Sequence, residues 1–117
     1  DDEEERASKL ARKLQFTHHG DSMRKTKEYI KNRLIQQGFS SSLSKDVVEE
    51  LDFSGNMLLE DDNLRKYALK AYHRYEKKYH GTELRNRVYR ACINQGYGYE
   101  LVTAVLDEME FIDDEED

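Results

Sequence analysis

Gln37-Gly38-Phe39 and Gln95-Gly96-Tyr97 are two copies of one short stretch, and apolar residues at helical spacing stand on both sides of each copy. A glycine directly after a helix commonly takes a positive φ at no steric cost, and the apolar residue after it folds back onto the helix. We therefore expect Gly38, Phe39, Gly96 and Tyr97 to form structural hinges, each of which joins the second helix of a repeated unit to the third.

The two hinges belong to an internal repeat. At an offset of 58 residues, seven identical pairs align, among them Gly38 with Gly96 and Phe53 with Phe111. Before Gly20 the offset becomes 61, so the first copy has three additional residues after Gly20. Loops accept insertions and helices do not, which places a loop at that point. We predict two tandem three-helix repeats, residues 1–53 and 63–117, joined by a connector at residues 54–62.

The composition favours an all-α protein. The chain has no Pro and only six Gly, and charged residues (38%) are as frequent as hydrophobic ones (37%), a mixture typical of solvated amphipathic helices. We expect the repeats to form an elongated, curved helical array. No apolar run approaches the roughly 20 residues that span a membrane, and the acidic opening is unlike a signal peptide. These features predict a cytoplasmic protein, and the opening without Met suggests a piece of a longer chain.

Each predicted helix has a capping signal and an apolar stripe. We expect helices at residues 6–18, 23–37 and about 40–51 in the first repeat. In the second repeat we expect one helix that begins after Asp62 or Asn63, one at residues 83–95 that Thr82 caps, and one after the second hinge. Met57-Leu58-Leu59 should pack against a repeat, Cys92 should be a buried thiol, and the acidic tail 113–117 should be disordered. The residues expected in the core are Ala7, Leu10, Ala11, Leu14, Met23, Thr26, Ile30, Leu34, Gln37, Leu43, Val47, Val48, Leu51, Leu64, Ala68, Ala71, Tyr75, Tyr79, Leu84, Val88, Ala91, Cys92, Leu101, Val102, Val105, Leu106 and Met109.

The net charge of −6 conceals two basic blocks. Residues 6–50 hold ten Lys or Arg and five acidic residues, and residues 63–90 hold nine Lys or Arg and two Glu. Lys66, Lys70 and Arg74 follow one another at i, i+4 spacing, and Lys9 and Lys13 occupy the positions of Lys70 and Arg74 in the first repeat. Such ladders can meet phosphates or an acidic protein groove, although an ordinary solvated face is the alternative. The predicted binding residues are Lys9, Lys13, Arg24, Lys27, Lys31, Lys66, Lys70, Arg74, Lys77, Arg85, Arg87 and Arg90.

Four tyrosines lie among these cations, Tyr67, Tyr72, Tyr89 and Tyr99. They could stack on unpaired bases or, more commonly, bury their rings between helices. The histidines have no metal-binding spacing, and the chain has neither a phosphate-binding glycine loop nor a nucleophile elbow. We therefore expect a protein that is not an enzyme and has no cofactor, metal or small-molecule substrate.

The second repeat resembles the RecX family of bacterial recombination regulators, which are built from tandem three-helix repeats. The resemblance rests on Tyr67-Ala68-Leu69-Lys70-Ala71, Lys78-Tyr79-His80-Gly81, Ile93-Asn94-Gln95-Gly96-Tyr97 and Val105-Leu106-Asp107-Glu108. It covers residues 3–53 and 61–111 and makes the chain similar to the C-terminal two repeats of a longer protein.

The resemblance implies a regulator in recombination, DNA repair and the SOS response. Such a protein binds in the groove of the RecA filament on single-stranded DNA and limits the recombinase and ATPase activities of RecA. In that case the basic ladders of both repeats would line one concave surface. Two alternatives stay open on the residues alone: a module that binds single-stranded nucleic acid directly, and a helical-repeat adaptor for an unrelated protein.

Overall fold

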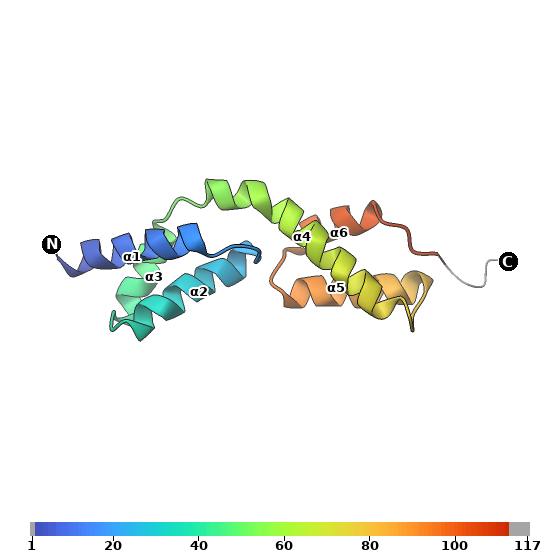
Figure 1. The fold of residues 1–117 in the computed structure, drawn as a ribbon, viewed down its shortest axis with the longest axis horizontal. Coiled ribbons are helices and arrows are strands. Elements are labelled where there is room, and N and C mark those ends of the chain that lie inside the picture. Colours follow the sequence, from blue (N-terminus) through green and yellow to red (C-terminus); the bar gives the residue numbers. More distant parts are fainter. Residues whose placement is uncertain (1, 113–117) are drawn as a thin grey trace. The chain divides into compact units, whose positions relative to one another are not determined.

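The computed structural model describes residues 2–112, and in that range the protein is all-α with no strand (Figure 1). The all-α class predicted from composition is confirmed. The chain forms two compact units, Asp1–Leu58 (the first unit) and Leu59–Asp117 (the second unit). The predicted acidic tail 113–117 lies outside the described residues. The helices are α1 (Glu3–Thr17), α2 (Met23–Gln36), α3 (Ser41–Glu49), α4 (Ser54–Tyr75), α5 (Gly81–Asn94) and α6 (Tyr99–Asp107).

Both hinges adopt the predicted left-handed conformation. Gly38 has φ +105° and Gly96 has φ +101°. At the end of α2 the Phe39 N–H donates to the Leu34 carbonyl and the Gly38 N–H to the Ile35 carbonyl. At the end of α5 the same two bonds run from Tyr97 to Cys92 and from Gly96 to Ile93. These are the two bonds of a Schellman motif, so each glycine ends the second helix of its unit and turns the chain into the third.

Helix α1 begins three residues earlier than predicted. The Asp2 side chain accepts a hydrogen bond from the Glu5 N–H, and the Glu5 side chain accepts one from the Asp2 N–H. This reciprocal capping box satisfies two backbone donors that a helix start leaves without partners. Glu3, Glu4 and Glu5 therefore lie in the first helical turn. In the next two helices the Ser22 side chain caps α2 and the Ser40 side chain caps α3.

The core of the first unit forms where its three helices meet. Ala7, Ala11 and Leu14 of α1 pack against Ile30 and Leu34 of α2, as their spacing predicts. Val47 and Val48 of α3 and Phe53 complete this core, and Leu10, Met23, Leu43 and Leu51 pack half-buried at its edge. Gln37, expected in the core, is exposed because α2 ends at Gln36 and the chain turns away there.

The predicted connector 54–62 is helical, because α4 begins at Ser54 rather than after Asp62 or Asn63. The Asp52 carboxylate accepts hydrogen bonds from the Ser54 N–H (2.9 Å) and hydroxyl (2.8 Å), and both bonds lower the pKa of Asp52. Gln15 of α1 donates its Nε2 to the Asp52 carbonyl and to Asn56 Oδ1, at 2.9 Å each. The expectation that Met57-Leu58-Leu59 packs against a repeat is wrong, because all three side chains are exposed.

The second unit buries the apolar stripe of α4 against α5 and α6. Its core contains the predicted Leu64, Ala68, Ala71, Leu84, Val88, Cys92, Val102, Val105 and Leu106, together with Tyr97 of the hinge. Tyr75 and Tyr79 pack at its edge and stay half-buried, since α4 ends at Tyr75. Cys92 is fully buried, and burial raises the pKa of its thiol to about 11.

Thr82 does not cap α5. The helix begins at Gly81, with His80 at the N-cap position and no side-chain hydrogen bond in that cap. Gly81 has φ +53°, and its N–H donates to the Ile112 carbonyl. The Ile112 carbonyl, in the segment after α6, therefore accepts from the first backbone N–H of α5. Among the helices of residues 2–112, none is long and apolar enough to cross a membrane.

Candidate binding surface on the basic helices

The predicted cations stand mainly at the surface of the two units. On α4 the side chains of Lys66, Lys70 and Arg74 are exposed one helical turn apart, and Lys77 follows in the turn after the helix. On α1 the exposed Lys9 and Lys13 repeat this spacing. Arg24, Lys27 and Arg90 are also exposed, whereas Lys31, Arg85 and Arg87 are half-buried.

Two arginines of the second unit are held by carboxylates. Arg65 donates its Nε to Asp61 Oδ2 and its Nη1 to Glu108 Oε1, both at 2.7 Å, and the bond to Arg65 lowers the pKa of Glu108. Arg85 donates its Nη2 to Asp107 Oδ1, also at 2.7 Å. Arg85 was predicted as a binding cation, but the structure places its charge beside a partner at the end of α6. The sequence alone does not predict the pairing of Arg65 with Glu108, because the two residues are 43 positions apart along the chain.

Two other arginines of this unit lie on tyrosine rings. The Arg87 guanidinium stands 4.1 Å from the centroid of the Tyr79 ring, and the Arg74 guanidinium stands 5.9 Å from that of Tyr75. The two rings are 6.3 Å apart and inclined by 58°. We call these four residues the Arg–Tyr cluster. It joins the end of α4 and the following turn to α5, and cation–π attraction favours these positions of the guanidinium groups beside the rings.

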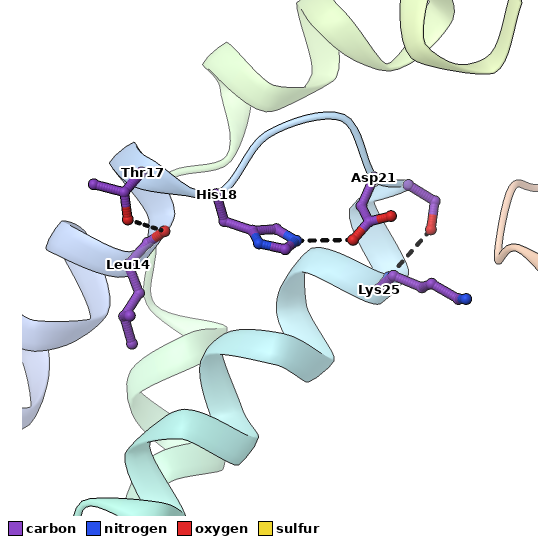
Figure 2. A network of polar contacts seen from close by, with 6 residues as sticks. Leu14, Thr17, His18, Asp21 and Lys25 are labelled. Carbon is purple, nitrogen blue, oxygen red and sulfur yellow. Dashed lines mark hydrogen bonds and ion pairs between the residues drawn. The ribbon is translucent and has the colours of Figure 1, made fainter. Parts of the chain in front are cut away.

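The first unit has a different group at the matching place, and Figure 2 shows its His18 and Asp21. With the repeat offsets, Tyr79 corresponds to His18 and Arg87 to Tyr29. The His18 and Tyr29 rings stack with centroids 4.0 Å apart and planes inclined by 16°. His18 Nε2 also lies 2.8 Å from Asp21 Oδ2, in the loop that carries the chain from α1 to α2. This group contains its own carboxylate, Asp21. It therefore links the two helices but presents no cation that lacks a carboxylate partner.

The remaining cations of α2 face different surroundings. Lys27 Nζ lies 5.0 Å above the ring of Phe53, and the guanidinium of Arg33 lies 5.8 Å from Tyr29. The Nε of Arg33 is buried and has no hydrogen-bond partner among the described residues. The first unit therefore uses part of its basic surface for contacts within its own fold.

The tyrosines separate into two groups. Tyr67, Tyr72 and Tyr89 are half-buried and pack against the core of the second unit, as expected of rings between helices. Tyr99 is different, because 64% of its surface is exposed at the start of α6.

No group of three or more His, Cys, Asp and Glu in residues 2–112 could hold a metal ion. An open hollow of about 360 Å³ on the first unit is lined by Glu4, Glu5, Ser8, Lys9, Arg12 and Glu50. It mixes both charges and contains no histidine or cysteine.

Comparison with known proteins finds similarity to bacterial proteins named regulatory protein RecX. Residues 60–106 match the family described as RecX, third three-helix domain. The chain is 31% identical over 109 residues to a regulatory protein RecX of Staphylococcus saprophyticus, an alignment that covers 93% of this chain and 40% of that protein. It is 32% identical over 103 residues to regulatory protein RecX of Streptococcus gordonii, covering 87% of this chain and 40% of that protein. No solved structure matches the chain.

A third relative gives the same proportions. Regulatory protein RecX of Staphylococcus aureus strain JH9 is 31% identical over 108 residues, which are 92% of this chain and 39% of that protein. The chain thus spans about 40% of the length of the curated relatives it matches.

Proposed function

We propose that this chain, which is similar to proteins named regulatory protein RecX, is a non-enzymatic regulator that binds the RecA filament on single-stranded DNA and lowers the recombinase and ATPase activities of RecA. One observation carries the proposal: the chain is about 30% identical, over most of its length, to proteins named regulatory protein RecX. In this role it acts in the cytoplasm, in recombination, DNA repair and the SOS response.

The exposed basic ladders support a binding role. Lys66, Lys70 and Arg74 present three charges along one face of α4, and no carboxylate of the described chain pairs with them. Solvation alone does not require cations at the same positions of both repeats, yet Lys9 and Lys13 occupy those of Lys70 and Arg74. We propose that these ladders contact acidic groups of the filament, because complementary charge speeds and orients protein association.

Charge reversal on α4 tests the proposal. Lys70→Glu with Arg74→Glu should raise the concentration of chain that halves the DNA-dependent ATPase activity of RecA by about tenfold or more, since it replaces attraction with repulsion. Binding is measured in parallel by co-sedimentation with RecA filaments. The matched control is Arg12→Glu with Lys45→Glu, which changes the net charge equally at exposed positions outside the predicted set.

The proposal requires that the unaltered chain co-sediments with the filaments and inhibits the ATPase. Failure of both would contradict the proposed function. Equal losses in the two double variants would show that total charge matters and that the α4 ladder does not.

A further inference from the structure

We propose that the Arg–Tyr cluster of the second unit (Arg74, Tyr75, Tyr79 and Arg87) binds the phosphates of a single-stranded nucleic acid, and that this contact requires no RecA. The inference goes beyond the proposed regulation of RecA, because it concerns direct contact with the strand. It also separates the two repeats, since the corresponding group in the first unit lacks the features that make the site.

The cluster holds two guanidinium groups beside tyrosine rings. Tyr79 supports Arg87 at 4.1 Å and Tyr75 supports Arg74 at 5.9 Å, and the two rings lie 6.3 Å apart. Arg87 and both tyrosines are half-buried, so less side-chain freedom is left to lose when a ligand binds. A guanidinium group that stacks on a ring keeps its N–H groups at the edge, where they can donate in pairs to phosphate oxygens.

Those donors have no partner within the described chain. Neither Arg74 nor Arg87 forms an ion pair or a hydrogen bond with any carboxylate of residues 2–112, in contrast to Arg65 and Arg85 of the same unit. Arg65 and Arg85 bond to Asp61, Glu108 and Asp107. The second unit therefore divides its arginines into a paired set at the end of α6 and an unpaired set at the turn between α4 and α5.

The surroundings of the unpaired set are strongly basic. Lys77 and Lys78 occupy the turn between Tyr75 and Tyr79, and both are exposed. Glu76, the one acidic residue of this turn, lies 2.9 Å from His73 Nδ1 through its Oε2. Residues 63–90 carry a net charge of +7, from nine Lys or Arg and two Glu. Such a field attracts a polyanion and releases its condensed counterions.

The first unit serves as an internal comparison. Its positions matching Arg74, Tyr75, Tyr79 and Arg87 hold Lys13, Leu14, His18 and Tyr29. Leu14 is buried, and the stacked His18 contacts Asp21. This part of the first unit therefore has one exposed cation, Lys13, and a carboxylate, Asp21. A strand should therefore contact the second unit in preference to the first.

The aromatic rings favour a nucleic acid over an acidic peptide. Both ligands offer pairs of oxygen atoms to arginine, but only unpaired bases gain from stacking on tyrosine rings or on guanidinium planes. A phosphodiester chain also brings one charge per nucleotide to Arg74, Lys77, Lys78 and Arg87 without requiring a particular sequence.

The test measures binding of the full chain to a fluorescein-labelled 15-nucleotide mixed-sequence DNA strand by anisotropy, without RecA and over a range of salt concentrations. We expect Arg74→Gln with Arg87→Gln to raise Kd by about tenfold or more and to reduce the slope of log K against log salt by about 1.4, because two phosphate contacts are lost. The matched control, Arg65→Gln with Arg85→Gln, removes the same charge from arginines that are already paired and should change Kd less than threefold.

Further variants separate a site from a structural contact. Arg87→Lys keeps the charge but loses the planar fork and should weaken binding without altering the melting temperature. Arg12→Gln, at an exposed position of the first unit outside the predicted binding residues, should leave binding of the strand unchanged. Equal losses in the two double variants, an unchanged salt slope, or no binding of the strand by the unaltered chain would overturn the proposal. Binding of a glutamate-rich peptide of equal charge with the same or higher affinity would assign the cluster to an acidic protein.

Discussion

At the scale of single residues, Gly38 is required by its backbone conformation and not by crowding. Its φ is +105°, and a Cβ built on it would meet no atom within 4 Å. Gly38→Ala should therefore lower the free energy of unfolding of the first unit by about 1–2 kcal/mol, the usual cost of a left-handed L-residue. Urea unfolding followed by circular dichroism measures this change.

Gly55 provides the matched control for Gly38. It also has open space around its α-carbon, but it lies in the first turns of α4 and has no positive φ. Gly55→Ala should stabilise the same unit by up to about 0.5–1 kcal/mol, because alanine loses less backbone freedom on entering a helix. A loss of stability in Gly55→Ala equal to that in Gly38→Ala would contradict the conformational explanation.

The sequence predicts best those features that a few neighbouring residues specify. Each hinge is specified by a glycine and the apolar residue after it, and a core position by its spacing along one helix. Leu64, Ala68 and Ala71 are buried as their spacing predicts. The prediction that Gln37 is buried is wrong for a local reason too. Gln37 continues the apolar stripe of Ile30 and Leu34, but it lies one position past the end of α2 and is exposed.

At the scale of helices, prediction fails where a helix start depends on partners elsewhere in the chain. Ser54-Gly55-Asn56 has the composition of a loop, yet Gln15 holds Asn56 and the Asp52 carbonyl from 37 or more residues away. The start of α5 likewise depends on the Ile112 carbonyl, which lies beyond α6. By contrast, the capping box of Asp2 and Glu5 is local, and its spacing would have identified the start of α1.

The junction of α1 with α2 yields a prediction at this scale. The His18 ring stacks on Tyr29 with centroids 4.0 Å apart, so it connects the end of one helix to the next. Its Nε2 also lies 2.8 Å from Asp21 Oδ2, a contact that Figure 2 draws. His18→Ala should lower the stability of the first unit by about 0.5–1.5 kcal/mol, the value of an aromatic pair beyond its buried area. Thermal unfolding at constant pH measures the effect.

His19 is the control for this junction, because it is the adjacent residue and its side chain is exposed. His19→Ala should leave the unfolding midpoint within about 1 °C, since substitutions of exposed residues without contacts usually have small effects. If the two alanine variants unfold alike, the stacked pair does not stabilise the junction.

At the scale of the whole molecule, the distribution of unpaired charge depends on which cations form ion pairs with carboxylates. The sequence shows two basic blocks but not that Arg65 and Arg85 are paired while Arg74 and Arg87 lie on tyrosines. The hydrogen bonds from Arg65 to Glu108 and from Arg85 to Asp107 join residues 43 and 22 positions apart, and helical periodicity does not predict such pairs. The candidate site was therefore predicted as a set of twelve cations, and the structure distinguishes among them by their partners.

Each unit has its own core, and Cys92 makes this division measurable. Its thiol is fully buried in the second unit with a pKa of about 11, so it should react with a disulfide reagent at pH 8 only when that unit opens. Gly96→Ala strains the hinge whose Tyr97 N–H donates to the Cys92 carbonyl. It should accelerate labelling about 5- to 30-fold, corresponding to a loss of about 1–2 kcal/mol. Gly38→Ala places the same strain in the other core and should change the rate less than twofold. Equal acceleration by both substitutions would mean that the two units open together, and equal rates for all variants in denaturant would confirm that the differences arise from the folded state.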